Sequence, residues 1–148
     1  MSLFMLAREV NNKESAVRYL QNKHVLHSDR VCAQGHNMSL HLADSRDRWR
    51  CNLRQCRTSI SLRKGTWLEN SKLPLDTFVL FVYCWSQEYT TTKFCSKELN
   101  MSLHTITDWK NYLREVCANS LLQTPVKLGG PGLTVEIDES CFTKRKNN

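Results

Sequence analysis

Two close pairs of metal-ligand residue types stand in the N-terminal half of this 148-residue chain. The first pair is Cys32-x3-His36 and the second is Cys51-x4-Cys56, with 14 residues between the pairs. Structural zinc is held by four soft or borderline ligands in a tetrahedron, which two such pairs on facing turns can supply. A segment of about 40 residues cannot bury enough apolar surface by itself, so a bound metal compensates for the missing core. The spacing therefore predicts a zinc ribbon over residues 29–70.

The fourth zinc ligand stays open at the level of sequence. The first pair contains a single cysteine, so a histidine has to complete the set. His36 is the expected ligand, and His27 or His41 could replace it. The alternative to a metal site is a group of buried free cysteines with histidines on the surface.

The chain has seven cysteines, an odd number, and its first residues lack the basic segment and small-residue cleavage site of a secretory signal. A reducing compartment follows, where metal binding or burial is expected rather than disulfides. Cys84, Cys95 and Cys117 fall on the inward faces of predicted helices, so we expect them to be small core residues. The longest apolar run, residues 78–85, is far shorter than the roughly 20 residues that span a bilayer. We expect a protein that is neither secreted nor in a membrane, located in the nucleus if eukaryotic and otherwise in the cytoplasm.

The net positive charge of the chain comes entirely from its first half. The net charge is +7; residues 1–72 contain 13 Lys and Arg against 6 Asp and Glu, and residues 73–148 contain 8 of each kind. Such an excess favours a polyanionic partner, most often nucleic acid, although a solvated basic face would have the same composition. Most of the excess lies between residues 46 and 64, where Asp47 is the only acidic residue and the basic residues are Arg46, Arg48, Arg50, Arg54, Arg57, Arg63 and Lys64.

Hydrophobic periodicity predicts helices on both sides of the ribbon and short strands within it. Residues 12–26 have a helical period, whereas residues 30–68 show the alternation typical of strands. Three helices are expected between residues 73 and 122, with a turn at 100–102 before the third. This order resembles a helix-turn-helix, whose recognition helix (102–118) would direct His104, Thr105 and Lys110 toward DNA. A plain three-helix bundle is the alternative.

The segment 133–138 alternates strictly between apolar and polar residues, which predicts a strand that follows a glycine-rich loop at 129–132. Asp138 stands at the end of this strand, where a carboxylate could bind Mg²⁺. One carboxylate does not make a two-metal site, and an exposed acidic strand end is the alternative.

In their order, these motifs resemble the Merlin-type transposases of animals and the related bacterial insertion-sequence transposases. The resemblance extends from about residue 15 to the end of the chain. Its components are Trp49-Arg50-Cys51-x4-Cys56, Ser61-Leu62-Arg63-Lys64-Gly65-Thr66-Trp67, Ser71-Lys72-Leu73-Pro74-Leu75, Thr107-Asp108-Trp109, Leu113-Arg114-Glu115-Val116-Cys117, Gly129-Gly130-Pro131-Gly132 and Val135-Glu136-Ile137-Asp138-Glu139-Ser140.

The resemblance implies a zinc ribbon and a helical region ahead of a ribonuclease-H-like domain that carries a DDE triad of acidic residues. Asp138 would match the first acidic residue of that triad. It also implies that transposon-end DNA is the partner, and that Mg²⁺ or Mn²⁺ serves catalysis only in a full-length relative. The first knuckle departs from the family, which usually has Cys-x2-Cys there. Since the other two acidic residues lie well downstream in the family, we expect no strand transfer from this chain as it stands.

Together these observations predict an α+β chain of several small modules. The expected function is zinc-dependent DNA binding as the N-terminal portion of a DDE transposase, with self-association as a further expectation. A domesticated or regulatory zinc-dependent DNA-binding protein and a zinc-ribbon protein-interaction module are the alternatives. The expected modules are an N-terminal helical segment (1–28), the zinc ribbon (29–70), a helix-turn-helix-like domain (71–123) and a loop with the start of a truncated catalytic domain (124–148).

Overall fold

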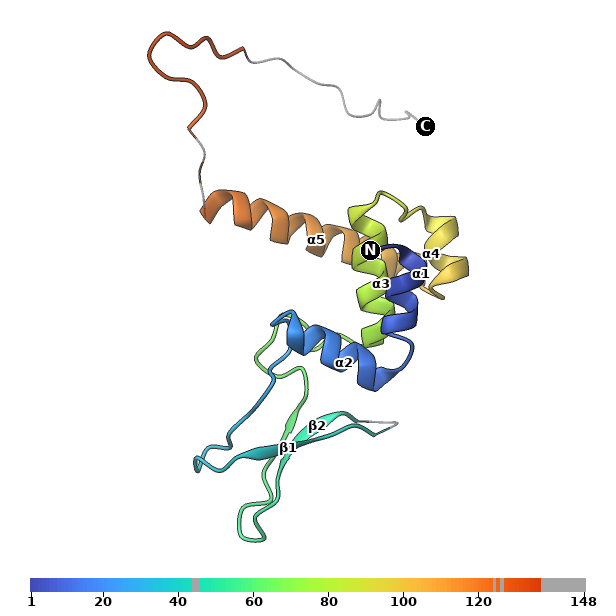
Figure 1. Cartoon of the computed structure of the whole chain (residues 1–148), viewed down its shortest axis with the longest axis vertical. Helices are drawn as coiled ribbons and strands as arrows, with labels where there is room; N and C mark the ends of the chain where they lie inside the picture. Colours follow the sequence, from blue (N-terminus) through green and yellow to red (C-terminus); the bar gives the residue numbers. More distant parts are fainter. Residues whose placement is uncertain (44–45, 124, 126, 137–148) are drawn as a thin grey trace. The chain divides into compact units, whose positions relative to one another are not determined.

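The computed structural model of this chain describes residues 1–43, 46–123, 125 and 127–136. Over these residues the fold is α+β, with five helices and one small antiparallel sheet (Figure 1). The chain divides into two compact units, Met1–Lys110 and Asn111–Asn148. Among the described helices, none has both the length and the apolar character needed to cross a bilayer.

The predicted short strands are confirmed. Strands β1 (Met38–His41), β2 (Arg48–Cys51) and β3 (Ser59–Ser61) form a sheet in the order β1-β2-β3. Trp49 lies opposite Leu40 on one side and Ile60 on the other. Because directly opposed residues share a face, the alternation collects the apolar side chains on one side of the sheet.

The two N-terminal helices begin at side-chain caps. Helix α1 (Leu3–Glu9) starts where the Ser2 hydroxyl accepts a hydrogen bond from the Met5 N–H, at 3.3 Å. Helix α2 (Lys13–Asn22) starts at a reciprocal capping box between Asn12 and Ser15. The sequence pattern predicted α2 but not α1 as a separate helix, since α1 has 7 residues and buries only Leu6. Both helices contact α3 (Leu75–Ser86).

The three predicted central helices are present as α3, α4 (Thr92–Glu98) and α5 (Leu103–Gln123). Phe81, Cys84 and Cys95 are fully buried, so two of the three predicted core cysteines are confirmed. The ring of Phe78 on α3 lies 5.1 Å from that of Trp109 on α5, and both rings contact Trp67 from the turn after β3. This aromatic cluster connects the end of the ribbon to the helices.

The prediction for Cys117 is wrong, because its side chain is exposed. The apolar face of α5 is buried at Ile106, Trp109 and Leu113, but Val116 is already 44% exposed. Helical periodicity identifies a face, and it carries no information on whether another element covers that face.

The predicted strand over 133–138 is also wrong for the residues that the structure describes. Residues 133–136 form no strand, and the Leu133 N–H instead donates to the Gly130 carbonyl at 3.0 Å in a turn. Leu133 and Val135 are exposed. Alternation can produce a strand only where a second strand supplies hydrogen-bond partners, and none lies beside this segment in the described chain. Asp138 lies outside the described residues.

Arg63 connects the end of the ribbon to the segment that precedes α3 through two hydrogen bonds. Its Nη1 and Nη2 atoms donate to the backbone carbonyls of Ser71 and Leu73, each at 2.7 Å. Burial lowers the pKa of Arg63 and the nearby charge of Asp47 opposes this effect, but a guanidinium stays protonated in proteins. Both donors therefore have a structural use.

Arg63→Ala is expected to destabilise the fold by about 2 kcal/mol, because two carbonyls lose charged hydrogen-bond donors. Urea unfolding followed by circular dichroism measures this change. Arg54→Ala, at an exposed position of the ribbon, should leave the midpoint nearly unchanged. Equal midpoints for the two variants would contradict the role given to Arg63.

Candidate metal centre and basic sheet face

Four side chains from the two predicted pairs converge at one end of the sheet. The ligand atoms of Cys32, His36, Cys51 and Cys56 all lie within 4.8 Å of one another. His36 Nδ1 is 3.5 Å from Cys32 Sγ and 3.8 Å from Cys51 Sγ. Cys56 Sγ is 3.7 Å from Cys32 Sγ. The arrangement brings together three thiols and one imidazole nitrogen.

Three of the six ligand-atom separations match a zinc tetrahedron, and all six are within 4.8 Å. Bonds of about 2.3 Å to sulfur and about 2.05 Å to nitrogen put two sulfurs about 3.8 Å apart and a sulfur and a nitrogen about 3.6 Å apart. The observed separations of 3.7 Å between sulfurs and 3.5–3.8 Å between sulfur and nitrogen agree with those values. The group could therefore hold a metal ion such as zinc.

The first pair is shaped by a tight turn. The Cys32 N–H donates to the His36 carbonyl at 2.9 Å, and the Gly35 N–H donates back to the Cys32 carbonyl at 2.9 Å. Gly35 has a φ of +79°, a left-handed conformation that glycine adopts at little cost. Val31 and Asn37 pair as an antiparallel bridge on either side of the turn. The turn holds Cys32 and His36 on the same side, so the pair can act as two ligands.

The second pair begins at the end of β2 and is closed by a second turn. The Leu53 carbonyl accepts from the N–H groups of both Cys56 and Arg57, each at 3.0 Å. The Cys51 N–H donates to the Thr58 carbonyl at 2.9 Å, which continues the sheet beyond the turn. Arg57 has a φ of +47°, in the left-handed region. Strand and turn together fix the two thiols.

Hydrogen bonds from Thr58 favour a thiolate at Cys56. The Thr58 hydroxyl lies 3.0 Å from Cys56 Sγ, and this contact, the Thr58 backbone and His36 lower the pKa of Cys56 to about 6. The backbone of Leu53 also favours a thiolate at Cys51, but burial and the neighbouring Cys56 and Cys32 outweigh it and raise the pKa of Cys51. A cation at the centre would relieve the repulsion among these thiolates, which are the form that binds metal.

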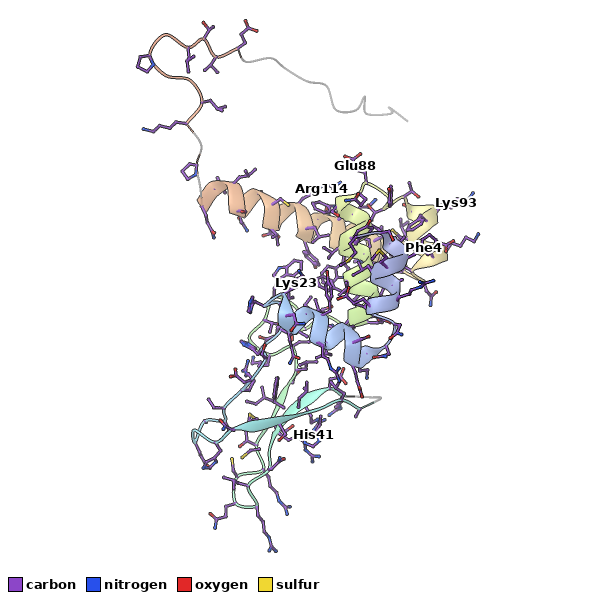
Figure 2. The ribbon with its side chains drawn as sticks, viewed as in Figure 1. Phe4, Lys23, His41, Glu88, Lys93 and Arg114 are labelled. Atoms are coloured by element: carbon purple, nitrogen blue, oxygen red, sulfur yellow. The ribbon has the colours of Figure 1, made fainter. Side chains whose placement is uncertain are left out.

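The two alternative histidines lie away from the cluster. His41 is exposed on β1, opposite Arg48 of β2 (Figure 2). His27 Nε2 would lie 3.8 Å from a side chain placed at Gly65. Neither histidine belongs to the group that could hold a metal. The choice among the three histidines, which sequence left open, falls on His36.

The other face of the sheet is polar and basic. Arg48 lies opposite His41 and Ser61, and Arg50 lies opposite Ser39 and Ser59. Opposed residues share a face, so these six side chains lie on the side away from Trp49. Two guanidinium groups therefore stand among three serine hydroxyls and an imidazole, a set of side chains suited to phosphate oxygens.

Asp47, the residue before Arg48 at the start of β2, is already paired. Asp47 Oδ1 lies 3.1 Å from Lys13 Nζ of α2 and also accepts from the Ala43 N–H at 3.2 Å. Lys13 Nζ donates as well to the Ala43 carbonyl at 2.6 Å. The charge of Asp47 is thus compensated by Lys13 of α2, so Asp47 does not form an ion pair with Arg48 or Arg50 among the contacts that the structure describes.

The other predicted DNA-contact residues of the ribbon fall into two groups. Arg46, Arg54 and Arg57 are exposed, and Arg46 lines a groove of about 480 Å³ with Arg48. Arg63 donates to two backbone carbonyls, and Lys64 Nζ forms an ion pair with Glu69 at 2.5 Å. The remaining residues of the groove are Asp47, Ser59, Ser61, Leu62, Arg63 and Ser71.

The predicted contact residues of the recognition helix lie in the first turns of α5. His104 Nδ1 is 2.6 Å from Asp108 Oδ2, and the Thr105 hydroxyl is 2.8 Å from the Ser102 hydroxyl. Lys110 is half-buried. These local contacts occupy side-chain hydrogen-bonding groups of His104 and Thr105 that a recognition helix would use to contact bases.

Sequence reasoning missed the hydroxyls that accompany the arginines and the carboxylate that pairs with Lys64. The signal for the hydroxyls was present, because Ser39, Ser59 and Ser61 alternate with the apolar residues that predicted the strands. The sequence pattern gives no such signal for Glu69, because its contacts with Lys64 and the Gly65 N–H arise from the conformation of the turn after β3.

Comparison with known proteins gives a distant relative. The chain is similar to the male abnormal protein mab-31 of Caenorhabditis elegans, with 26% identity over 164 residues. The alignment covers 97% of this chain and 38% of mab-31, so the chain spans about two fifths of the length of the curated relative that it matches. No protein-family model matches the chain. No solved structure matches it.

Proposed function

We propose that this chain is a zinc-stabilised module that binds duplex DNA through the basic face of its sheet. The observation that carries the proposal is the register of the sheet, which places Arg48 and Arg50 opposite serine residues on one face, while the opposite face is apolar. Arginine and hydroxyl donors are the groups that commonly contact phosphate oxygens of DNA. Asp47 lies next to Arg48 and also lines the groove, but its charge is compensated by the ion pair with Lys13.

Zinc is the metal that this donor set favours. Three thiolates and one imidazole in a tetrahedron are a common structural zinc site, and no open position is needed. The ion would supply folding free energy to a ribbon whose apolar core is small. Cys51 ends β2, the strand that also carries Arg48 and Arg50, so metal binding would hold the basic face in shape.

The helical part supports DNA binding more weakly. Helices α4 and α5 follow one another across a short turn, and His104 and Thr105 lie at the start of α5, where a recognition helix meets base edges. In this proposal the arginines of the sheet supply phosphate affinity, and α5 supplies whatever base contacts are made. The transposase resemblance extends the proposal to transposon ends as the target and to Asp138 as a catalytic residue of longer relatives.

Arg50→Ala tests this function. Each lost phosphate contact is expected to flatten the dependence of log K on log salt by about 0.9 and to weaken binding to a duplex roughly fivefold near 0.1 M salt. Fluorescence anisotropy of a labelled, mixed-sequence duplex at several salt concentrations measures both quantities. Arg8→Ala changes an exposed arginine on α1 and serves as the control with no expected effect. Binding that is absent, or independent of salt, would contradict the proposal.

A protein-interaction module is the second candidate, and one observation favours it. Helix α1 and the residues before it expose large apolar side chains, with Met1, Phe4 and Met5 at 70%, 81% and 63% exposure. Phe4 is labelled in Figure 2. A partner held by these side chains would be insensitive to salt, because apolar contacts do not release counterions. The salt titration therefore separates the two candidates.

A further inference from the structure

The turn after β3 places a carboxylate inside a group of cationic and N–H donors. Glu69 Oε1 lies 2.5 Å from Lys64 Nζ, and Glu69 Oε2 accepts from the Gly65 N–H at 2.7 Å. Gly65 has a φ of +72°, which turns the backbone so that its N–H can face the carboxylate. One carboxylate thus bridges an ammonium and a backbone amide four residues before it.

Arg30 and His27 complete the surroundings of Gly65. Arg30 Nη1 donates to the Lys64 carbonyl at 2.8 Å and would lie 3.6 Å from a side chain placed at Gly65. The positive charge of Arg30 contributes to a lowered pKa of Glu69, behind the larger effects of Lys64 and the Gly65 N–H. His27 Nε2 lies on the same side of Gly65, is buried, and has no hydrogen-bond partner within the described chain.

Two cations, a backbone N–H and a spare imidazole nitrogen are the groups that bind phosphate oxygens in proteins. A carboxylate presents two oxygens with the charge and geometry of two phosphate oxygens. The ion pair itself contributes little to stability, because the Lys64 side chain is 61% exposed and solvent screens such a pair even though Glu69 is 31% exposed.

We propose that Lys64, Arg30 and the Gly65 N–H form a phosphodiester subsite in which the Glu69 carboxylate is the resident anion, displaced when nucleic acid binds. The inference rests on the proposed function. It explains why Lys64, part of the basic stretch, is not free in the structure: Glu69 occupies the position that a phosphate oxygen would take. In this proposal Glu69 weakens nucleic-acid binding. Only a ligand with enough other contacts can displace the Glu69 carboxylate.

Glu69→Gln tests the subsite, because the amide can still accept from the Gly65 N–H but no longer neutralises Lys64. On a labelled mixed-sequence duplex we expect roughly fivefold tighter binding near 0.1 M salt and a slope of log K against log salt that is steeper by about 0.9. Lys64→Ala alone should change little, since the phosphate contact that it removes from the complex is offset by the Glu69 ion pair that binding no longer has to break. The double variant Glu69→Gln with Lys64→Ala should return close to wild type.

Glu98→Gln is the matched control, because Glu98 pairs with Lys97 at 3.9 Å on α4 and its loss changes the net charge by the same amount. Equal tightening by the two Gln variants would show a general charge effect and overturn the subsite. A loss of affinity in Glu69→Gln, with the fold confirmed by its amide NMR spectrum, would assign Glu69 a purely structural role and also overturn it.

The Gly65 amide gives an independent measurement. Its NMR signal should shift on addition of the unlabelled duplex to wild-type protein, and a signal that stays in place at saturation would contradict displacement. Failure of the proposed function looks different, because wild type would then not bind the duplex at all. If wild type binds, Arg50→Ala weakens binding and Glu69→Gln has no effect, the proposed function stands and this inference fails.

Discussion

Cys51→Ser is expected to abolish stoichiometric metal binding and to unfold the three-stranded sheet. Cys51 Sγ lies 3.8 Å from His36 Nδ1, the side chain is buried, and the residue ends β2. A serine hydroxyl is a poor zinc ligand, and structural zinc supplies about 10–16 kcal/mol of apparent binding free energy in zinc-finger peptides at neutral pH. A ribbon of this size has no apolar core that could replace such a contribution. Elemental analysis of the purified protein and its amide NMR spectrum measure the two effects.

Cys117→Ser is the matched control for this substitution. Cys117 is exposed on α5 and belongs to no group of potential ligands among the described residues. The Cys117→Ser variant should bind one metal ion per chain and give an amide NMR spectrum like that of the wild type. A chelator added to wild type should reproduce the Cys51→Ser spectrum. Metal-free protein with a folded sheet would show that the four side chains are not a structural metal site.

Phe81→Ala should destabilise the helical core by about 3–5 kcal/mol and lower the melting temperature by roughly 10–20 °C. Phe81 is 0% exposed at the centre of α3, the helix that α1 and α2 both contact. Truncation removes the largest fully buried side chain among the described residues and leaves a cavity that the surrounding helices fill only in part. Thermal unfolding of the metal-loaded protein, followed by the helical circular dichroism signal, measures the loss.

Phe4→Ala removes the same side chain from a position that is 81% exposed. Its expected effect on stability is within about 0.5 kcal/mol. A similar loss of stability for both variants would mean that Phe4 is buried in solution, for example against a partner. In that case the protein-interaction candidate would gain support.

The metal group and the basic face share one strand, which couples stability to the proposed activity. The thiol of Cys51 and the apolar Trp49 alternate along β2 with Arg48 and Arg50. A ribbon without its metal would lose the register that places the arginines opposite Ser59 and Ser61. DNA affinity should therefore follow metal content, and a variant such as Arg50→Ala, which keeps the metal, separates loss of contacts from loss of the fold.

Local pattern alone determined much of this protein. Cysteine spacing identified Cys32, Cys51 and Cys56, and period-two alternation identified the three strands, because metal-ligand knuckles and strands are set by neighbouring residues. Helical periodicity located α2, α3, α4 and α5 for the same reason. The basic stretch is evident from amino-acid composition, since a local excess of arginine needs no knowledge of the fold.

Only the tertiary structure decided which of these residues are available and which are already used. His36 was selected over His27 and His41 by the turn at Gly35 and the position of β2, and no spacing rule contains that information. In the sequence, Arg63 and Lys64 look like the other basic residues of the ribbon. In the structure, Arg63 donates hydrogen bonds to two backbone carbonyls and Lys64 forms an ion pair with Glu69. Cys117 fits the helical period of α5 but is exposed, because no element of the described chain covers it. Residues 133–136 alternate as a strand would but form none, because no strand pairs with them in the described chain. A period describes one element, whereas burial, pairing and charge compensation depend on a second element that the fold must bring near.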